Sequence, residues 1–374
     1  MMLLFLFVLF ALLMVWSVKY LRKTGHRFLW ITSPVRFSQK RAGDSNGPIS
    51  IYVAICDHFE PFWGNVYQEI AEHRVATWCR EFSRASREHT DFLGNHPKHT
   101  FFYSEQDYNP LLLDSLQKLC RDGYGDVELL LTHHDDTVQH FRHRIEEIRD
   151  VLFFHHGLLR KDNNGNIIYG FIHGHWALNN SRPDGRKCGV NNEIPLLKQS
   201  GCYADFTYPS APDITQPRII NSIYFAADTP GIPCAHQRGY AAERECWSDN
   251  DLLLIQGPLS LNWKNGYLGL LPTIENGGLS HNHRYYQSRA DCWVRSAVHI
   301  SGIKDHIFIK LFTHGAIDKT MQYFFTEKGL HQMWQDLETR YNDGKHYRLY
   351  YVTAYEMYLT VKNLCIGNKV SHNK

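Results

Sequence analysis

The sequence predicts an α/β fold built on a parallel β-sheet, either open or closed into a barrel. The chain has 374 residues, of which 43% are hydrophobic and 21% charged. That is long enough for one large domain or two ordinary ones, and apolar enough for a sizeable core. From Ile49 onward, short apolar runs alternate with longer amphipathic stretches. This alternation is typical of βαβ units, whose strands pair in parallel.

The apolar runs and amphipathic stretches give the expected elements in order. We expect strands at 51–56, 100–103, 127–132, 167–172, 204–208, 219–226, 252–256 and 307–312. We expect helices at 67–87, 110–121, 137–152, 192–199, 284–300, 327–341 and 351–363. The clearest helix is 137–152, in which Phe141, Ile145 and Ile148 recur at steps of three and four. No linker divides residues 49–366, so we expect one folded domain there and a frayed tail at 367–374.

The first 18 residues form an apolar run broken only by Ser17, and a basic segment follows directly. The run is at the short end of what spans a bilayer. No basic residue precedes it and it ends without an A-x-A-like site, which favours an uncleaved transmembrane anchor over a signal peptide. The positive flank lies on the C-terminal side, so the positive-inside rule favours a cytoplasmic domain on an inner (plasma) membrane. Residues 19–48 are then a basic and polar stalk.

Charge and cysteine usage exclude several classes of protein. The chain has 40 Lys and Arg against 38 Asp and Glu, which gives no basic surplus for nucleic-acid binding. Its nine cysteines are scattered without a C-x-x-C pair, which is neither a disulfide framework nor a zinc ribbon. The unusual number is 23 histidines, which bind metals and titrate near neutral pH.

Histidine and aspartate gather where the expected strands end. The carboxyl ends of parallel strands share one edge of a sheet, where ligands bind. Side chains distant in sequence are therefore brought together there, and this set has the composition of a metal site with acid/base partners. The candidates are Asp57 and His58 after 51–56, His133 and His134 after 127–132, His173, His175 and Trp176 after 167–172, Asp205 within 204–208, and His314 after 307–312.

These segments resemble the polysaccharide deacetylase (NodB-homology) family. The run from His99 to Tyr103, the helix 110–121 and the run from Gly123 to His134 resemble a TFF-type strand leading through a helix to a strand with metal-binding histidines. Leu311 to His314 resembles the family's late strand ending in a catalytic histidine, and 201–206 resembles its "GY" strand. The likeness spans about 49–320 and implies a distorted (β/α) barrel of about seven parallel strands. The chain would be a divergent member of the superfamily joining such deacetylases with certain glycoside hydrolases.

The resemblance implies roles for individual residues. Asp57 stands where the family has its general base, and His58 where it has a metal-binding aspartate. His133 matches the first ligand histidine, but Thr137 stands where the second is expected, so His134 is the substitute candidate. The remaining candidates are His314 as the acid that protonates the leaving amine, His173 or His175 as a further metal ligand, and Trp176 and Asp205 as metal or substrate contacts. Imidazole ligands favour Zn²⁺ as the divalent cofactor.

The expected function is a metal-dependent hydrolase that removes N-acetyl groups from a polysaccharide or membrane-linked glycan. Two alternatives stay open. A glycoside hydrolase on the same barrel needs two carboxylates, for which Glu60, Asp205 and Asp228 are candidates. A non-catalytic glycan-binding or assembly protein would need neither the carboxylates nor the metal. In each case we expect a glycan partner, attachment to the membrane through the N-terminal helix, and no nucleic acid.

Overall fold

The computed structural model describes residues 29–32, 34–37, 47–227, 229, 231–267 and 271–367. The expected anchor (1–18), most of the stalk (19–48) and all but the first residue of the tail lie outside these ranges. None of the helices described is both long enough and apolar enough to cross a membrane.

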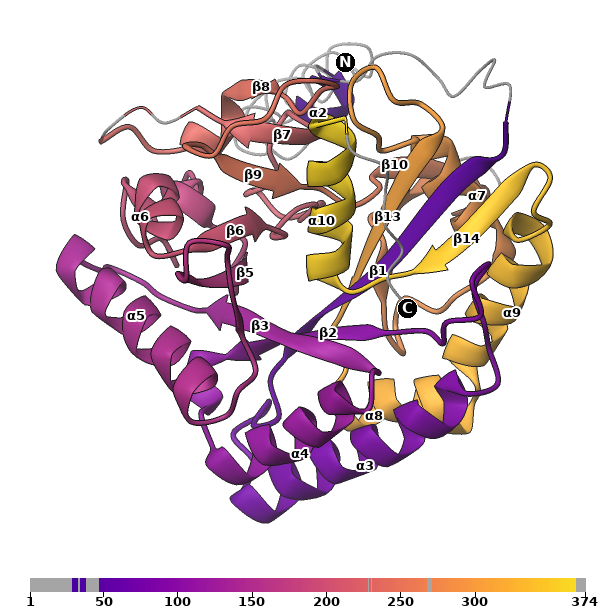
Figure 1. The fold of residues 1–374 in the computed structure, drawn as a ribbon, viewed down its shortest axis with the longest axis horizontal. Coiled ribbons are helices and arrows are strands. Elements are labelled where there is room, and N and C mark those ends of the chain that lie inside the picture. Colours follow the sequence, from indigo (N-terminus) through magenta and orange to yellow (C-terminus); the bar gives the residue numbers. More distant parts are fainter. Residues whose placement is uncertain are drawn as a thin grey trace, which may run out of the picture.

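One largely parallel sheet of twelve strands forms the centre of the fold (Figure 1). Its order is β12-β13-β1-β2-β3-β5-β6-β9-β7-β8, with β14 paired to β1 and β4 paired to β5. The strands are β1 (Ile49–Phe59), β2 (His99–Ser104), β3 (Gly125–Leu131), β4 (Arg160–Lys161), β5 (Ile167–His173), β6 (Cys202–Asp205), β7 (Ile223–Ala226), β8 (Gly239–Ala241), β9 (Leu252–Ile255), β12 (Gly278–Leu279), β13 (His306–Thr313) and β14 (Tyr347–Tyr351). A separate hairpin joins β10 (Ser260–Tyr267) and β11 (Leu271–Glu275).

Helices follow most of the parallel strands. The α-helices are α2 (Leu29–Thr32), α3 (Gln68–Ser86), α4 (Pro110–Arg121), α5 (Val138–Phe154), α6 (Glu193–Gln199), α7 (Gln287–Ser296), α8 (Asp318–Met321), α9 (Gly329–Tyr341) and α10 (Ala354–Cys365). Short turns are η2 (Glu105–Asp107), η3 (Leu178–Asn180), η4 (Ala235–Gln237) and the π-helical η5 (Gln322–Thr326). Figure 1 shows α3 and α4 side by side on one side of the sheet.

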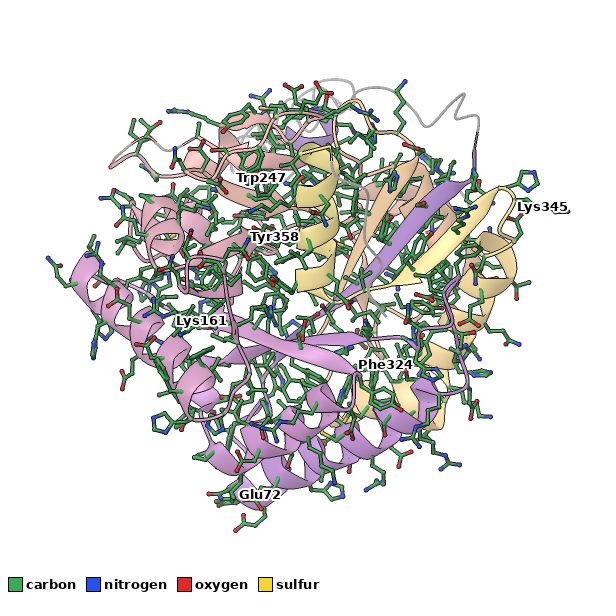
Figure 2. All side chains as sticks on the ribbon, viewed as in Figure 1. Glu72, Lys161, Trp247, Phe324, Lys345 and Tyr358 are labelled. Carbon is green, nitrogen blue, oxygen red and sulfur yellow. The ribbon has the colours of Figure 1, made fainter. Side chains whose placement is uncertain are left out.

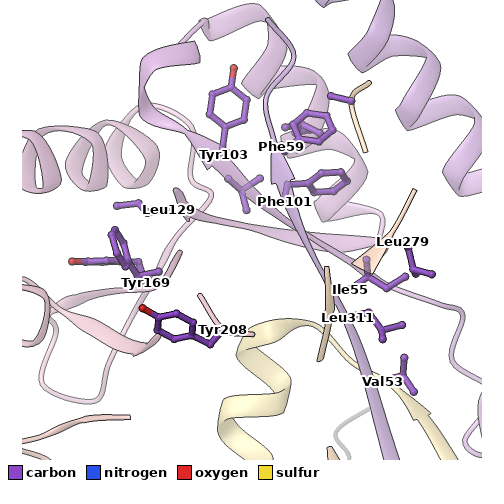
Figure 3. Close-up of a cluster of buried hydrophobic side chains, with 14 of the residues drawn as sticks. Val53, Ile55, Phe59, Phe101, Tyr103, Leu129, Tyr169, Tyr208, Leu279 and Leu311 are labelled. Atoms are coloured by element: carbon purple, nitrogen blue, oxygen red, sulfur yellow. The ribbon is translucent and has the colours of Figure 1, made fainter. Parts of the chain in front are cut away.

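The alternation of side chains along β1 separates the two faces of the sheet. Val53, Ile55 and Phe59 belong to the larger apolar cluster, which includes the buried faces of α3 and α4 (Figure 3). Tyr52 and Cys56 belong to a second cluster, which includes the buried face of α10. We call these sides the α3 face and the α10 face. Figure 2 shows Trp247 near Tyr358 of α10, and their ring centroids lie 5.9 Å apart.

The α/β class and the parallel sheet are confirmed, but the closed barrel of about seven strands is wrong. The strands from β12 to β9 pair in parallel, and β9 then pairs antiparallel with β7. The short strand β8 ends the sheet beyond β7, so the described strands form no hydrogen-bonded ring. The outer edge of β9, which a closed ring would need for parallel pairing, is instead paired with the antiparallel strand β7.

Most expected elements have a counterpart, with two informative differences. Residues 351–363 were expected as one helix, whereas β14 pairs in parallel with β1 and α10 begins only at Ala354. Thr353 and Glu356 form a reciprocal capping box that fixes this start. Helix 284–300 shortens to α7 because Ala297 adopts the left-handed conformation that ends helices.

Candidate functional site

Parallel pairing brings the predicted strand ends to one edge of the sheet. His173, the last residue of β5, lies opposite Leu131, the last residue of β3. At the far end of the same edge, Asp57 of β1 lies opposite Thr313 of β13. The register therefore places the segments after β1, β3, β5 and β13 in one row, as the sequence predicted.

A buried group of His133, His173 and Glu193 is the strongest candidate metal centre. Their ligand atoms lie within 4.8 Å of one another. The Nε2 of His133 lies 3.4 Å from Glu193 Oε1, and the Nε2 of His173 lies 4.0 Å from the same oxygen. All three side chains are buried, and burial lowers the pKa of His173 well below its usual value. A neutral imidazole is the form that binds a metal.

Hydrogen bonds fix two of these three side chains. His133 Nδ1 donates to Asp136 at 3.2 Å, and the Asn179 N–H donates to Glu193 Oε2 at 2.5 Å. If Nδ1 carries the single proton of a neutral ring, the Nε2 lone pair of His133 faces Glu193 Oε1 and two acceptors point at each other. A proton or a cation between them would relieve this contact. A carboxylate behind a ligand histidine is a common arrangement in metal sites.

His173 fits a cation only after a change of tautomer. The His175 N–H donates to His173 Nδ1 at 3.2 Å, which places the proton of the neutral ring on Nε2. That Nε2 has no hydrogen-bond partner among the described residues. A cation would take the Nε2 lone pair and move the proton to Nδ1, at the expense of the His175 contact.

Glu193 is the residue that the sequence analysis missed. It lies in the first turn of α6, where an acidic residue ordinarily favours the helix dipole and faces water. The one feature of the sequence that could have indicated Glu193 is its place at the start of the expected helix 192–199, which lies between the apolar expected strands 167–172 and 204–208. The structure buries it completely, and an unpaired buried carboxylate is costly.

A second group of rings lies at the ends of β1, β5 and β13. His58 and His314 have ring centroids 4.9 Å apart, and the ring of Trp176 lies 6.1 Å from that of His58. His314 Nδ1 lies 3.3 Å from Glu60 Oε2, a histidine–carboxylate pair that is partly open to solvent. Burial and the neighbouring His314 lower the pKa of His58 well below its usual value.

Asp57 lies on the opposite face of β1 from His58. Its Oδ2 accepts from His99 Nε2 at 2.9 Å and its Oδ1 accepts from the Gly315 N–H at 2.7 Å. Trp78 of α3 covers the same spot, since an added Cβ at Gly315 would meet both Asp57 and Trp78. Asp57 therefore anchors the turn that carries His314, and the structure does not place it with the metal candidates.

The remaining predicted residues lie in three different surroundings. His134 is exposed and turns away from His133, accepting from the Lys187 N–H through Nδ1 at 2.9 Å. His175 lies beside the metal candidate, and burial lowers its pKa to about 4. The Asp205 carboxylate accepts from the Thr207 N–H at 3.1 Å and from its hydroxyl at 2.7 Å, and burial raises its pKa to about 7.

Buried polar atoms without a partner are concentrated around these residues. Such atoms are rare in folded proteins, and a bound water or ion or a catalytic role is the usual explanation. Within the described part of the chain they include His58 Nδ1, His173 Nε2, His175 Nδ1, Trp176 Nε1 and both ring nitrogens of His236. The imidazole of His236 stacks on Tyr208, with ring centroids 5.1 Å apart, and burial lowers its pKa to about 3.

Comparison with known proteins adds no family to this geometry. The chain matches no family model. It also matches no curated protein sequence. The resemblance described above therefore stays a prediction.

Proposed function

We propose that the protein is a metal-dependent hydrolase that removes N-acetyl groups from a glycan. The observation that carries this proposal is the convergence of two imidazole nitrogens and one carboxylate oxygen at His133, His173 and Glu193. A divalent cation held there, with Zn²⁺ favoured by the imidazoles, would polarise a carbonyl oxygen and lower the pKa of a water molecule.

The His314–Glu60 pair is suited to proton transfer. Glu60 orients the ring through Nδ1, so the other nitrogen, Nε2, can take a proton from an attacking water and return it to a departing amine. Asp57 acts on this step only indirectly, by holding Gly315 and hence His314 in place. This assignment moves the role of base from Asp57 to His314, because both Asp57 oxygens are occupied on the other face of β1.

The carboxylates favour amide hydrolysis over glycoside hydrolysis. A glycosidase needs two carboxyl groups that face the scissile bond. Asp205 is fully buried and bonded to Thr207 through both oxygens, and Asp228 lies outside the described residues. Of the two candidates that the structure describes, only Glu60 is both partly exposed and at the edge where the strands end.

The test is metal content and acetate release by the purified full chain. We expect about one Zn²⁺ per chain by elemental analysis, and acetate release from N-acetylated glucosamine oligomers. His133→Ala, His173→Ala and Glu193→Gln should each lower zinc affinity and activity by about tenfold or more. His134→Ala is the matched control, because it removes the exposed neighbour and should leave both unchanged.

Retention of zinc and activity by the three variants would contradict the proposal. Reducing-sugar release without acetate would favour the glycoside hydrolase instead. A wild-type chain with neither zinc nor activity would leave the non-catalytic glycan-binding alternative.

A further inference from the structure

The loop after β1 holds an exposed tryptophan beside the His314–Glu60 pair. Trp63 is 47% exposed, and its ring centroid lies 5.5 Å from that of His314 with the planes at 49°. Together with the contacts described above, this makes a continuous row of four rings in the order Trp63, His314, His58 and Trp176. We call this row the ring arc.

The loop that carries Trp63 is fixed by a buried arginine. Arg74 of α3 is 5% exposed and its Nη1 donates to the carbonyl oxygens of Pro61 and Trp63, at 2.8 and 2.9 Å. Its Nε and Nη2 donate to the two carboxylate oxygens of Asp318, at 3.0 and 2.7 Å. Asp318 begins α8, directly after the turn that carries His314, so one guanidinium ties the Trp63 loop to that turn.

A second contact fixes the same loop from the other side. The Phe62 N–H donates to Asp107 Oδ2 at 3.2 Å, and Asp107 ends η2 after β2. The Trp63 backbone is thus held between elements that follow β1, β2 and β13, although nearly half of its side chain is open to solvent. A pre-organised aromatic side chain of this kind loses little conformational freedom when it binds a ligand.

The inner half of the ring arc points to the chemistry of that ligand. His58 Nδ1 and Trp176 Nε1 are buried and have no hydrogen-bond partner in the described part of the chain. A ligand that offers hydrogen-bonding oxygens beside a flat apolar face would suit both these two nitrogens and the exposed ring of Trp63. A sugar ring has both, since its C–H groups stack on aromatic rings while its hydroxyl and acyl oxygens accept hydrogen bonds.

We propose that Trp63 is the stacking platform for a sugar residue adjacent to the one that undergoes reaction, so that the protein takes glycan oligomers in preference to monosaccharides. This inference rests on the proposed function for the identity of the reacting sugar. Trp63 acts as a specificity-determining residue, because it lies at the outer end of the ring arc and His58 and Trp176 lie at its inner end.

The test is calorimetric titration of the full chain with β-1,4-linked N-acetylglucosamine oligomers of one to five residues. We expect the tetramer to bind at least about tenfold more tightly than the monosaccharide, and Trp63→Ala to remove that advantage. Trp63→Phe keeps an aromatic face and should retain most of it. Trp263→Ala is the matched control, since Trp263 of β10 is 62% exposed and lies on the separate hairpin.

Three results would overturn the proposal: equal affinity for the monosaccharide and the oligomers, unchanged tetramer binding by Trp63→Ala, or an equal loss in Trp263→Ala. An acetate assay on the same samples separates this inference from the proposed function. Binding that depends on Trp63 without acetate release would refute the hydrolase and support the platform. Acetate release from the tetramer that Trp63→Ala leaves unchanged would refute the platform and support the hydrolase.

Discussion

Substitution of Gly189 by alanine tests the candidate metal centre with a single methyl group. A Cβ at Gly189 would lie 1.8 Å from Cε1 and 2.0 Å from Nδ1 of His133. Ordinary contact begins near 3.4 Å, so the imidazole must move by about 1.6 Å. The backbone of Gly189 is outside the left-handed region, so this clash is the main cost of the substitution.

The displaced ring loses both contacts that define the centre. His133 Nδ1 leaves Asp136, and Nε2 leaves Glu193. Overpacking of this kind costs about 1–3 kcal/mol. The lost hydrogen bond to a carboxylate costs about 1.5–3 kcal/mol more at most. We therefore expect the free energy of unfolding to fall by about 1–6 kcal/mol, the lower value applying if Asp136 finds another donor. Zinc affinity should fall by about 10–100-fold.

The assay is urea unfolding together with zinc competition against a chromophoric chelator, both on the full chain. Gly47→Ala is the control, because a Cβ there meets no atom within 4 Å. The three atoms nearest to the added Cβ all belong to the His133 ring, so in a His133→Ala background Gly189→Ala should cost less than about 0.5 kcal/mol further. The reasoning is refuted if Gly189→Ala binds zinc like wild type, or if its cost persists without the His133 ring.

Three further predictions concern buried charges elsewhere in the fold. Burial raises the pKa of Asp205 from 3.8 to about 7. Relative to Asp205→Asn, the free energy of unfolding of wild type should therefore fall by up to about 4 kcal/mol as the pH rises from about 4 to about 7. Urea unfolding measures this, and a difference between the two proteins that does not change with pH would contradict it. Burial lowers the pKa of Lys310 from 10.5 to about 8. Relative to Lys310→Met, the free energy of unfolding of wild type in urea should therefore rise by up to about 3 kcal/mol between about pH 8 and pH 10.5. A difference that stays constant over this range would argue against a buried ammonium. Arg160→Met leaves the buried Glu128 carboxylate without its guanidinium and should lower the free energy of unfolding by about 3–5 kcal/mol, measured by heat or urea. Arg84→Met, at an exposed position, should lower it by less than about 0.5 kcal/mol. Equal losses in the two variants would show that the Arg160–Glu128 pair does not stabilise the fold.

The position of the site was predictable because parallel strands impose it. Once 127–132 and 167–172 are strands of one parallel sheet, His133 and His173 must lie near each other, and the Leu131–His173 register realises this. The opposite placement of Asp57 and His58 likewise follows from the two-residue period of a strand. The position of Asp57 conflicts with the role of general base that the family resemblance implied, because Asp57 lies on the face of β1 that α3 covers.

The membership of the site was not predictable to the same degree. Glu193 and His133 are 60 residues apart, and their contact depends on how α6 packs against the sheet. The same holds for Arg74 and Asp318, which are 244 residues apart and fix the Trp63 loop. No local sequence pattern predicts either pair, because neither the helix period nor the charge pattern of a segment indicates which distant segment will pack against it.

The sequence by itself determined the α/β alternation, the longer parallel strands and most of the helices, and the edge where imidazoles gather. Those features follow from hydrophobic periodicity and turn chemistry, which act over a few residues. Only the tertiary structure decided that the sheet stays open and that Glu193, not His134, lies beside His133. It also decided that Asp57 holds the turn that carries His314, through its hydrogen bond from the Gly315 N–H. These depend on packing between distant segments, because a buried charge is stable only where the tertiary structure brings it a partner.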